Sequence, residues 1–271
     1  MAGGRTLRPS GGGFGIGRPL PGTLAIIVAC TASYVIWLSG LRLEIPWMWD
    51  LALVPQDTVR GKLWQPLTSL LLHAPSRPTH LLFNMLMLWI FGNQMEALLG
   101  RRDYLFTCLW SGLGGALMTI VVGGILHAII GPTSDWGRIW LAPTVGASGM
   151  VMGIIMLWAG INWTRRIQLL FLGEMTGRTA GLIFIGIELL TALSFSEDSW
   201  TSHLGGAAVG YAVGRGYFKP RFWKKAAARR KHRKTQQRLR RFEVIEGGRD
   251  DTAGPPIWGP GAKDDKGPTI H

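Results

Sequence analysis

Charged residues are scarce in the first 218 positions of this 271-residue chain. Only 24 of those 218 residues, 11%, are Asp, Glu, Lys or Arg. A soluble domain draws about 25% of its residues from these four types. The remaining 21 of the 45 charged residues lie at positions 219–271. So few charges exclude an ordinary water-soluble fold for the first 218 residues and predict a membrane protein.

Cysteine is equally scarce, and one common metal motif is missing. The two cysteines, Cys30 and Cys108, both lie inside apolar runs, which excludes a disulfide framework. The chain has no HExxH pair, the zinc-binding pattern of many hydrolases. Its net charge of +13 comes mostly from the tail, and cytoplasmic orientation of a membrane protein explains that charge before nucleic acid does. We therefore expect no metal site of this type and no nucleic-acid partner.

What the chain does have is long apolar runs. A membrane-spanning helix needs roughly 20 mostly apolar residues. Six segments meet this requirement, at about 22–41, 80–99, 104–130, 145–163, 179–196 and 201–218. The sequence therefore predicts an all-α membrane protein, a six-transmembrane-helix bundle over residues 22–218. The long connection at 42–79 contains Trp47, Trp49 and Trp64 among prolines, which predicts a loop lying in the membrane interface.

Basic residues predict the orientation, because Lys and Arg are in excess on the cytoplasmic side. They follow the second, fourth and sixth spans: Arg101 and Arg102, then Arg165, Arg166 and Arg178, then twelve basic residues between 219 and 241. Both termini are therefore expected in the cytoplasm, with the bundle in a plasma or inner membrane. Residues 1–21 are predicted to be a disordered N-terminus, and 219–271 a basic tail that is disordered toward its end.

Polar residues open the three spans that run inward from the outer surface. The second span begins with His80 and Asn84, the fourth with Ser148 inside a Gly-Ala-Ser-Gly run, and the sixth with His203. All of them lie a few residues below the outer surface. A site assembled from three helices requires such a common depth.

Ser148 and His203 are the candidate catalytic pair. A hydroxyl is a weak nucleophile and needs a base within hydrogen-bond reach, and a neutral imidazole can take its proton and return it to a leaving amine. Gly149 on the fourth span and Gly206 and Gly210 on the sixth give both helices small faces. Such faces let helices touch backbone to backbone, so the pair can come within reach.

Each of these residues also has a structural interpretation. The run around Ser148 can serve close helix packing alone, and Asn84 can hold two helices together through its amide. His203 can be an interfacial histidine bonded to water. His73, His80 and His203 can together bind a metal, although the chain has no HExxH pair.

The acidic residues are assigned no catalytic role. Glu188 in the fifth span and Glu96 in the second are interpreted as packing or capping residues, as is His127 in the third. Glu197 and Asp198 lie in an acidic connection and are expected to be solvated. With no acid placed to orient the histidine, the sequence predicts a two-residue Ser/His arrangement.

The combined motifs resemble those of the rhomboid family of intramembrane serine proteases over about residues 20–218. They are the HxxxN pattern from His80 to Asn84, the GxSG pattern from Gly146 to Gly149, and His203 followed by Gly206 and Gly210. The resemblance implies a six-helix bundle that cleaves transmembrane or membrane-adjacent segments of other proteins without a cofactor. The long first connection matches the family's interfacial loop.

The same resemblance implies individual roles. Ser148 would be the nucleophile and His203 the general base, and His80, Asn84 and the backbone N–H of Ser148 would form the oxyanion site. Gly149 and Gly210 match the family's close helix contact. Two positions depart from the family pattern: Gln65 stands where an arginine is usual, and Met152 where an aromatic ring usually stacks on the histidine.

Two other functions are compatible with parts of the sequence. A catalytically inactive relative that binds and escorts membrane proteins typically loses the serine or the histidine, and this chain keeps both. A transporter should show an internal repeat or charged groups near the midplane, and the sequence shows no convincing repeat. The substrate, the gating helix and the oligomeric state are not specified by any motif.

Overall fold

The structure is a computed structural model that describes residues 17–168, 173–193 and 200–217. Residues 1–16 of the N-terminus predicted to be disordered lie outside this part, as does the whole basic tail at 219–271. Glu197 and Asp198, predicted to be solvated, lie outside it as well. The described part is predominantly helical and contains one small sheet.

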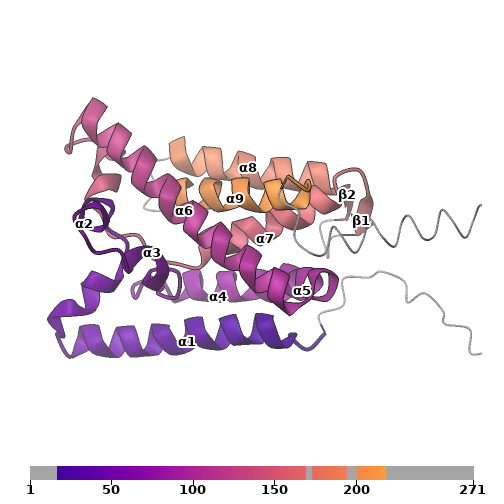
Figure 1. Cartoon of the computed structure of the whole chain (residues 1–271), viewed down its shortest axis with the longest axis horizontal. Coiled ribbons are helices and arrows are strands. Elements are labelled where there is room, and N and C mark those ends of the chain that lie inside the picture. Colours follow the sequence, from indigo (N-terminus) through magenta and orange to yellow (C-terminus); the bar gives the residue numbers. More distant parts are fainter. Residues whose placement is uncertain (1–16, 169–172, 194–199, 218–271) are drawn as a thin grey trace, which may run out of the picture. The chain divides into compact units, whose positions relative to one another are not determined.

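Helices occupy all six predicted spans (Figure 1). They are α1 (Pro21–Arg42), the run formed by α4 (Pro78–Met87), the π-helical turn η2 (Leu88–Gly92) and α5 (Asn93–Leu99), then α6 (Arg101–Ile130), α7 (Ser148–Ile161), α8 (Gly177–Leu193) and α9 (Trp200–Gly214). Their ends agree with the predicted ranges to within about four residues. By length and composition, α1 and α6 can cross a bilayer, and α7 is a shorter apolar helix. Crossing by all six segments stays a prediction.

Glycines bring α6, α7 and α9 into backbone contact. A side chain at Gly206 would overlap the carbonyl oxygen of Gly149, and one at Gly210 would overlap that of Gly153. On the other side of α9, the backbone at Gly205 meets Gly114 of α6, which runs diagonally across α9 in Figure 1. α7 is buried along its length from 149 to 160. It therefore forms the centre of the helical core.

The N-terminus of α1 is held by polar side chains of α5. Glu96 is buried, and its carboxylate accepts hydrogen bonds from the N–H groups of Gly22 and Thr23 at 2.8 and 2.7 Å and from the Thr23 hydroxyl at 2.9 Å. Asn93 accepts a further bond from the N–H of Leu20 at 2.7 Å. These bonds satisfy N–H groups that have no acceptor within α1. Glu96 is thus a capping residue, as predicted.

The connection between α1 and α4 is folded into short helices. They are the 3₁₀ turn η1 (Pro46–Leu51), α2 (Pro55–Val59) and α3 (Gln65–Thr68). The side chain of Gln65 is completely buried and accepts from the Val54 N–H at 3.1 Å and the Thr58 hydroxyl at 2.9 Å. Leu53 also pairs with Thr144, just before α7. The predicted loop is therefore an ordered layer attached to the start of α7.

The prediction of an all-α chain missed a β-hairpin between α7 and α8. Strand β1 (Arg166–Gln168) pairs antiparallel with β2 (Glu174–Thr176). Three-residue strands carry too short an alternation of apolar and polar residues to be recognised in a sequence. A second short element, the 3₁₀ turn η3 (Gly137–Trp140), lies between α6 and α7.

Substituting Gly210 by alanine should separate α7 from α9. The added methyl group would overlap the Gly153 carbonyl, and such overpacking costs typically about 1 to 3 kcal/mol. Gly186→Ala in α8 is the matched control, because its added carbon would meet no described atom within 4 Å beyond the adjoining backbone of its own helix. We expect thermal unfolding in detergent micelles to show a lower midpoint for Gly210→Ala and an unchanged or raised midpoint for the control. Equal midpoints would contradict the contact.

Candidate active site

α7 begins at Ser148 because the chain turns sharply just before it. Gly146 has φ +135°, a conformation that residues with a side chain rarely adopt. The turn is held by bonds from the Gly146 N–H to the Ser69 carbonyl at 3.0 Å and from the Ala147 N–H to Nε2 of His73 at 3.5 Å. Ser148 therefore lies in the first helical turn, where N–H groups lack acceptors within the helix and the dipole is positive.

His80 on α4 lies against the same turn. A side chain at Gly146 would begin 2.8 Å from Cε1 and 3.1 Å from Nε2 of His80, and 3.4 Å from Oγ of Ser148. The imidazole and the hydroxyl therefore border the small space that the glycine leaves open. Asn84, one turn further along α4, is buried and donates Nδ2–H to the His80 carbonyl at 2.9 Å. That bond uses one of the two hydrogens of its amide.

The first turn of α9 packs on the first turn of α7. A side chain at Gly149 would begin 2.8 Å from Oγ and 3.0 Å from the carbonyl oxygen of Ser202. Gly149 follows Ser148 in the chain, and Ser202 precedes His203. The contact therefore brings the helical turns that carry the predicted nucleophile and base against each other.

His203 has an acidic partner in Glu188, for which the sequence pattern predicted a packing or capping role. Nδ1 of His203 lies 2.6 Å from Oε2 of Glu188 on α8. Both side chains are mostly buried, with 16% of the histidine and 11% of the glutamate exposed. An ionised carboxylate can only accept a hydrogen bond, so in a neutral imidazole bound to it Nδ1 carries the hydrogen and Nε2 keeps the lone pair.

The sequence did contain a signal for Glu188. α8 ends five residues after Glu188, and α9 begins three residues before His203. Two consecutive helices joined by a short connection run in opposite directions, so residues at similar distances from that connection lie at similar depth. An acid inside an apolar segment is also a functional candidate by default. Depth alone, however, does not decide which face of α8 turns toward α9.

His73 contacts the turn that precedes Ser148. Its ring is completely buried, with Nδ1 3.3 Å from the Leu71 carbonyl and Nε2 facing the Ala147 N–H. Its ring centre is 5.3 Å from that of His80. Burial, and then the neighbouring His80, lower the pKa of His73 from 6.5 to about 4, so the ring is neutral at pH 7. Among the described residues, no three His, Cys, Asp or Glu side chains cluster as metal ligands.

The part of the chain that contains this site matches a known protein family. The rhomboid domain matches residues 60–220, more than half of the chain. The chain belongs to the rhomboid family. Rhomboid proteins are integral membrane proteins, which agrees with the apolar α1 and α6. The matched region contains every residue of the candidate site.

Named relatives of this rhomboid chain occur in a plant and in bacteria. RHOMBOID-like protein 12, mitochondrial, of Arabidopsis thaliana is 26% identical over 194 residues, 69% of this chain and 55% of the relative. YdcA of Bacillus subtilis (strain 168) is 27% identical over 156 residues, 56% of this chain and 66% of the relative. Rhomboid protease AarA of Providencia stuartii is 26% identical over 170 residues, 60% of this chain and 58% of the relative. The chain thus spans between half and two thirds of these relatives.

The two departures from the family pattern now have structural descriptions. Gln65 holds the first connection through the bonds to Val54 and Thr58, and its Nε2 also lies 3.3 Å from the Asp50 carbonyl. A neutral amide here links three parts of the loop. Met152, one turn after Ser148, is buried in the core. Neither substitution removes a polar group that borders the serine.

The lowered pKa of His73 should make stability depend on pH. Its unfolded pKa is near 6.5 and its folded pKa about 4, so the unfolded chain binds the proton first as pH falls. Its stabilising effect is complete above pH 6.5 and is lost between pH 6.5 and 4, by up to about 3 kcal/mol. Thermal unfolding in micelles between pH 7.5 and 4.5 should therefore show a shallower decline for His73→Gln than for the wild type. Identical declines would contradict the assignment.

Proposed function

We propose that this rhomboid protein is an intramembrane serine endopeptidase, with Ser148 as nucleophile and His203 as general base. The observation that carries the proposal is the contact of Gly149 with Ser202, which sets the first turns of α7 and α9 against each other. If these glycines served helix packing alone, the hydrogen bond between Nδ1 of His203 and Glu188 would have no function. Relatives named as rhomboid proteases support the same activity.

The proposed reaction starts with the free lone pair on Nε2 of His203. This nitrogen accepts the hydroxyl proton of Ser148 as Oγ attacks the carbonyl carbon of the scissile peptide bond. The tetrahedral intermediate collapses, and His203 returns the proton to the leaving amine, which leaves an acyl-enzyme ester. A water molecule then attacks the ester, with His203 again as base, and releases the new carboxyl terminus and the serine.

The proposed oxyanion site surrounds the start of α7. The backbone N–H of Ser148 lies at the positive end of the helix, and His80 borders the space next to the hydroxyl. Asn84 retains a second amide hydrogen beyond the one bonded to the His80 carbonyl. Donors fixed in advance around the developing negative charge lower the barrier without reorganising during the reaction.

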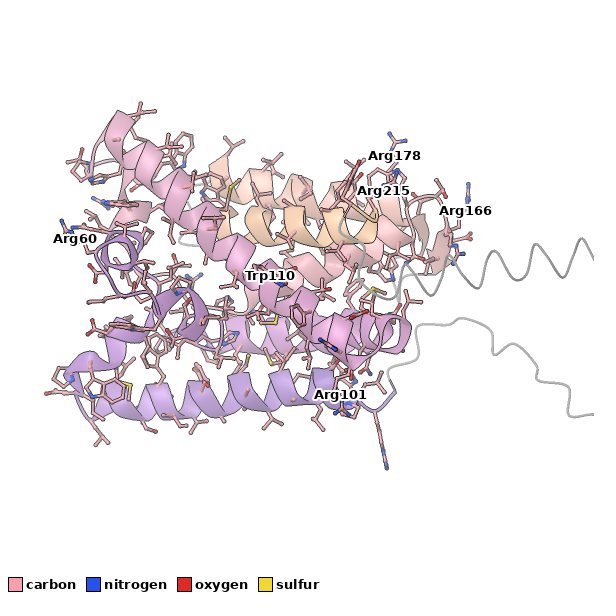
Figure 2. The ribbon with its side chains drawn as sticks, viewed as in Figure 1. Arg60, Arg101, Trp110, Arg166, Arg178 and Arg215 are labelled. Atoms are coloured by element: carbon pink, nitrogen blue, oxygen red, sulfur yellow. The ribbon has the colours of Figure 1, made fainter. Side chains whose placement is uncertain are left out.

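The substrates we propose are transmembrane or membrane-adjacent segments of other proteins, reached from within the bilayer. All six helical segments would span it, with both termini in the cytoplasm of a plasma or inner membrane. The distribution of arginines supports this orientation: Arg101, Arg166, Arg178 and Arg215 lie toward one end of the helices in Figure 2, and Arg60 lies toward the other. Basic residues collect on the cytoplasmic side, so the serine would open outward.

A fluorophosphonate probe tests the nucleophile directly. We expect the membrane-embedded protein to be labelled and to cleave a transmembrane test substrate, and Ser148→Ala to lose both activities. Ser202→Ala is the matched control, because its hydroxyl also borders Gly149, and it should keep labelling. Equal labelling of the wild type and Ser148→Ala would show that Ser148 is not the nucleophile. Absence of labelling in a folded wild type would favour the inactive escort function.

Changes on α4 test the oxyanion site. His80→Ala and Asn84→Ala each remove one donor, and loss of one such donor reduces turnover roughly 10²- to 10³-fold. KM should change less, because these donors act mainly on the charge of the transition state. Leu82→Ala is the control on the same helix, since its side chain is exposed. Unaltered kcat in correctly folded His80→Ala and Asn84→Ala would make α4 a structural element only.

A further inference from the structure

The contact between Glu188 and His203 is a short one. Oε2 of Glu188 and Nδ1 of His203 are 2.6 Å apart. This is at or below the short end of the range for N–H···O bonds and is typical of bonds in which an ionised group takes part. Each residue exposes less than a fifth of its side chain, so the bond is only weakly screened by solvent.

We propose that Glu188 is a positioning residue for the general base, which makes the site a Ser148–His203–Glu188 triad. The proposal rests on the proposed protease function. The carboxylate accepts the hydrogen on Nδ1, and this fixes the tautomer in which Nε2 can take the proton of Ser148. When that proton arrives, the imidazole becomes a cation, and the adjacent carboxylate stabilises it. Glu188 does not itself take up the proton.

The position of Glu188 in α8 argues for such a role. α8 contains only one other ionisable residue, Arg178 in its first turn, and the apolar side chains around Glu188 are exposed on the helix surface: Leu182, Ile183, Ile187, Leu189, Leu190 and Leu193. An acid among residues that face lipid is costly unless it is paired. Glu188 is turned inward, against the histidine. The single acid of α8 and the histidine of α9 therefore meet at one point.

The rest of α8 is attached to the core on both sides of this contact. At its beginning, the Gly177 N–H donates to the Asn162 carbonyl at 3.1 Å. Near its end, the indole N–H of Trp136 donates to the Ala192 carbonyl at 3.2 Å, one turn beyond Glu188. These two bonds, together with the packing of α8 on α7 and α9, hold the helix in place. The carboxylate is thus held at His203 by more than its own bond.

Few other ionisable groups lie near this pair among the residues that the structure describes. α7 carries none along its whole length. From α6, the nearest to the outer end is His127, whose Nδ1 lies 3.1 Å from the Gly137 carbonyl. His80 and His73 lie against the turn that precedes Ser148. Glu188 is therefore the acid, within the described residues around the serine, that can stabilise a cation on His203.

Kinetics of Glu188→Gln in the full-length protein, reconstituted in liposomes, tests the proposal. The amide keeps the size of the side chain and removes its charge. For cleavage of a transmembrane test substrate we expect kcat to fall by roughly 10²- to 10⁴-fold, with KM changed by no more than about threefold. Without the anion, the imidazolium is less favourable, so the acid limb of the kcat/KM profile should move to lower pH. Glu188→Asp keeps the charge and should restore part of kcat.

Trp136→Phe is the matched control for a purely structural role. It removes the bond to Ala192, an attachment near the end of α8, and leaves the carboxylate in place. We expect a lower unfolding midpoint with the acid limb unchanged. If Glu188→Gln behaved in the same way, with an unmoved acid limb and a loss of kcat no greater than that of the control, the contact would be a structural tie and the proposal would be overturned.

The outcome is separable from failure of the proposed function itself. If Ser148→Ala abolishes cleavage while Glu188→Gln leaves kcat and the pH profile unaltered, the protease assignment stands and the positioning role fails. If Ser148→Ala retains full cleavage, the protease assignment fails whatever Glu188→Gln does.

Discussion

Backbone contact between α7 and α9 is the constraint on which the candidate site depends. Gly206 and Gly210 of α9 lie directly on the carbonyl groups of Gly149 and Gly153, where even one methyl group would overlap. In an apolar environment, close packing replaces the hydrophobic effect as the force between helices, and small residues permit it. This contact begins at the first turns of both helices, which carry Ser148 and His203. It therefore limits how far apart these two residues can lie.

Buried hydrogen bonds fix the ends of the helices that the glycines do not hold. Glu96 caps α1 from α5, Gln65 ties the first connection together, and the Gly177 N–H joins the start of α8 to the Asn162 carbonyl. A buried polar group without a partner is costly, so each of these bonds selects one arrangement of segments distant in the chain. The ordered loop supports the turn at Gly146, because the Ser69 carbonyl accepts the hydrogen bond of the Gly146 N–H. That turn then fixes the start of α7.

Much of this arrangement could be predicted from composition and spacing. Apolar runs located all six helical segments, and the Gly-Ala-Ser-Gly run marked the start of α7 at Ser148. The hairpin of β1 and β2 was missed because each strand is only three residues long, and the short helices of the first connection because prolines and scattered charges resemble an irregular loop. Such elements exist through their contacts with the bundle, not through a pattern of their own.

The sequence by itself determined where the six long helical segments lie, where the glycine faces lie, and that a serine and a histidine begin two of those helices. Only the tertiary structure decided what contacts them. The pairing of Glu188 with His203 depends on how α8 is rotated, and the support of the turn before Ser148 by His73 depends on how the first connection folds back. Both result from contacts between different elements, and the apolar pattern of a helix indicates which face is buried but not which residue of another element that face meets.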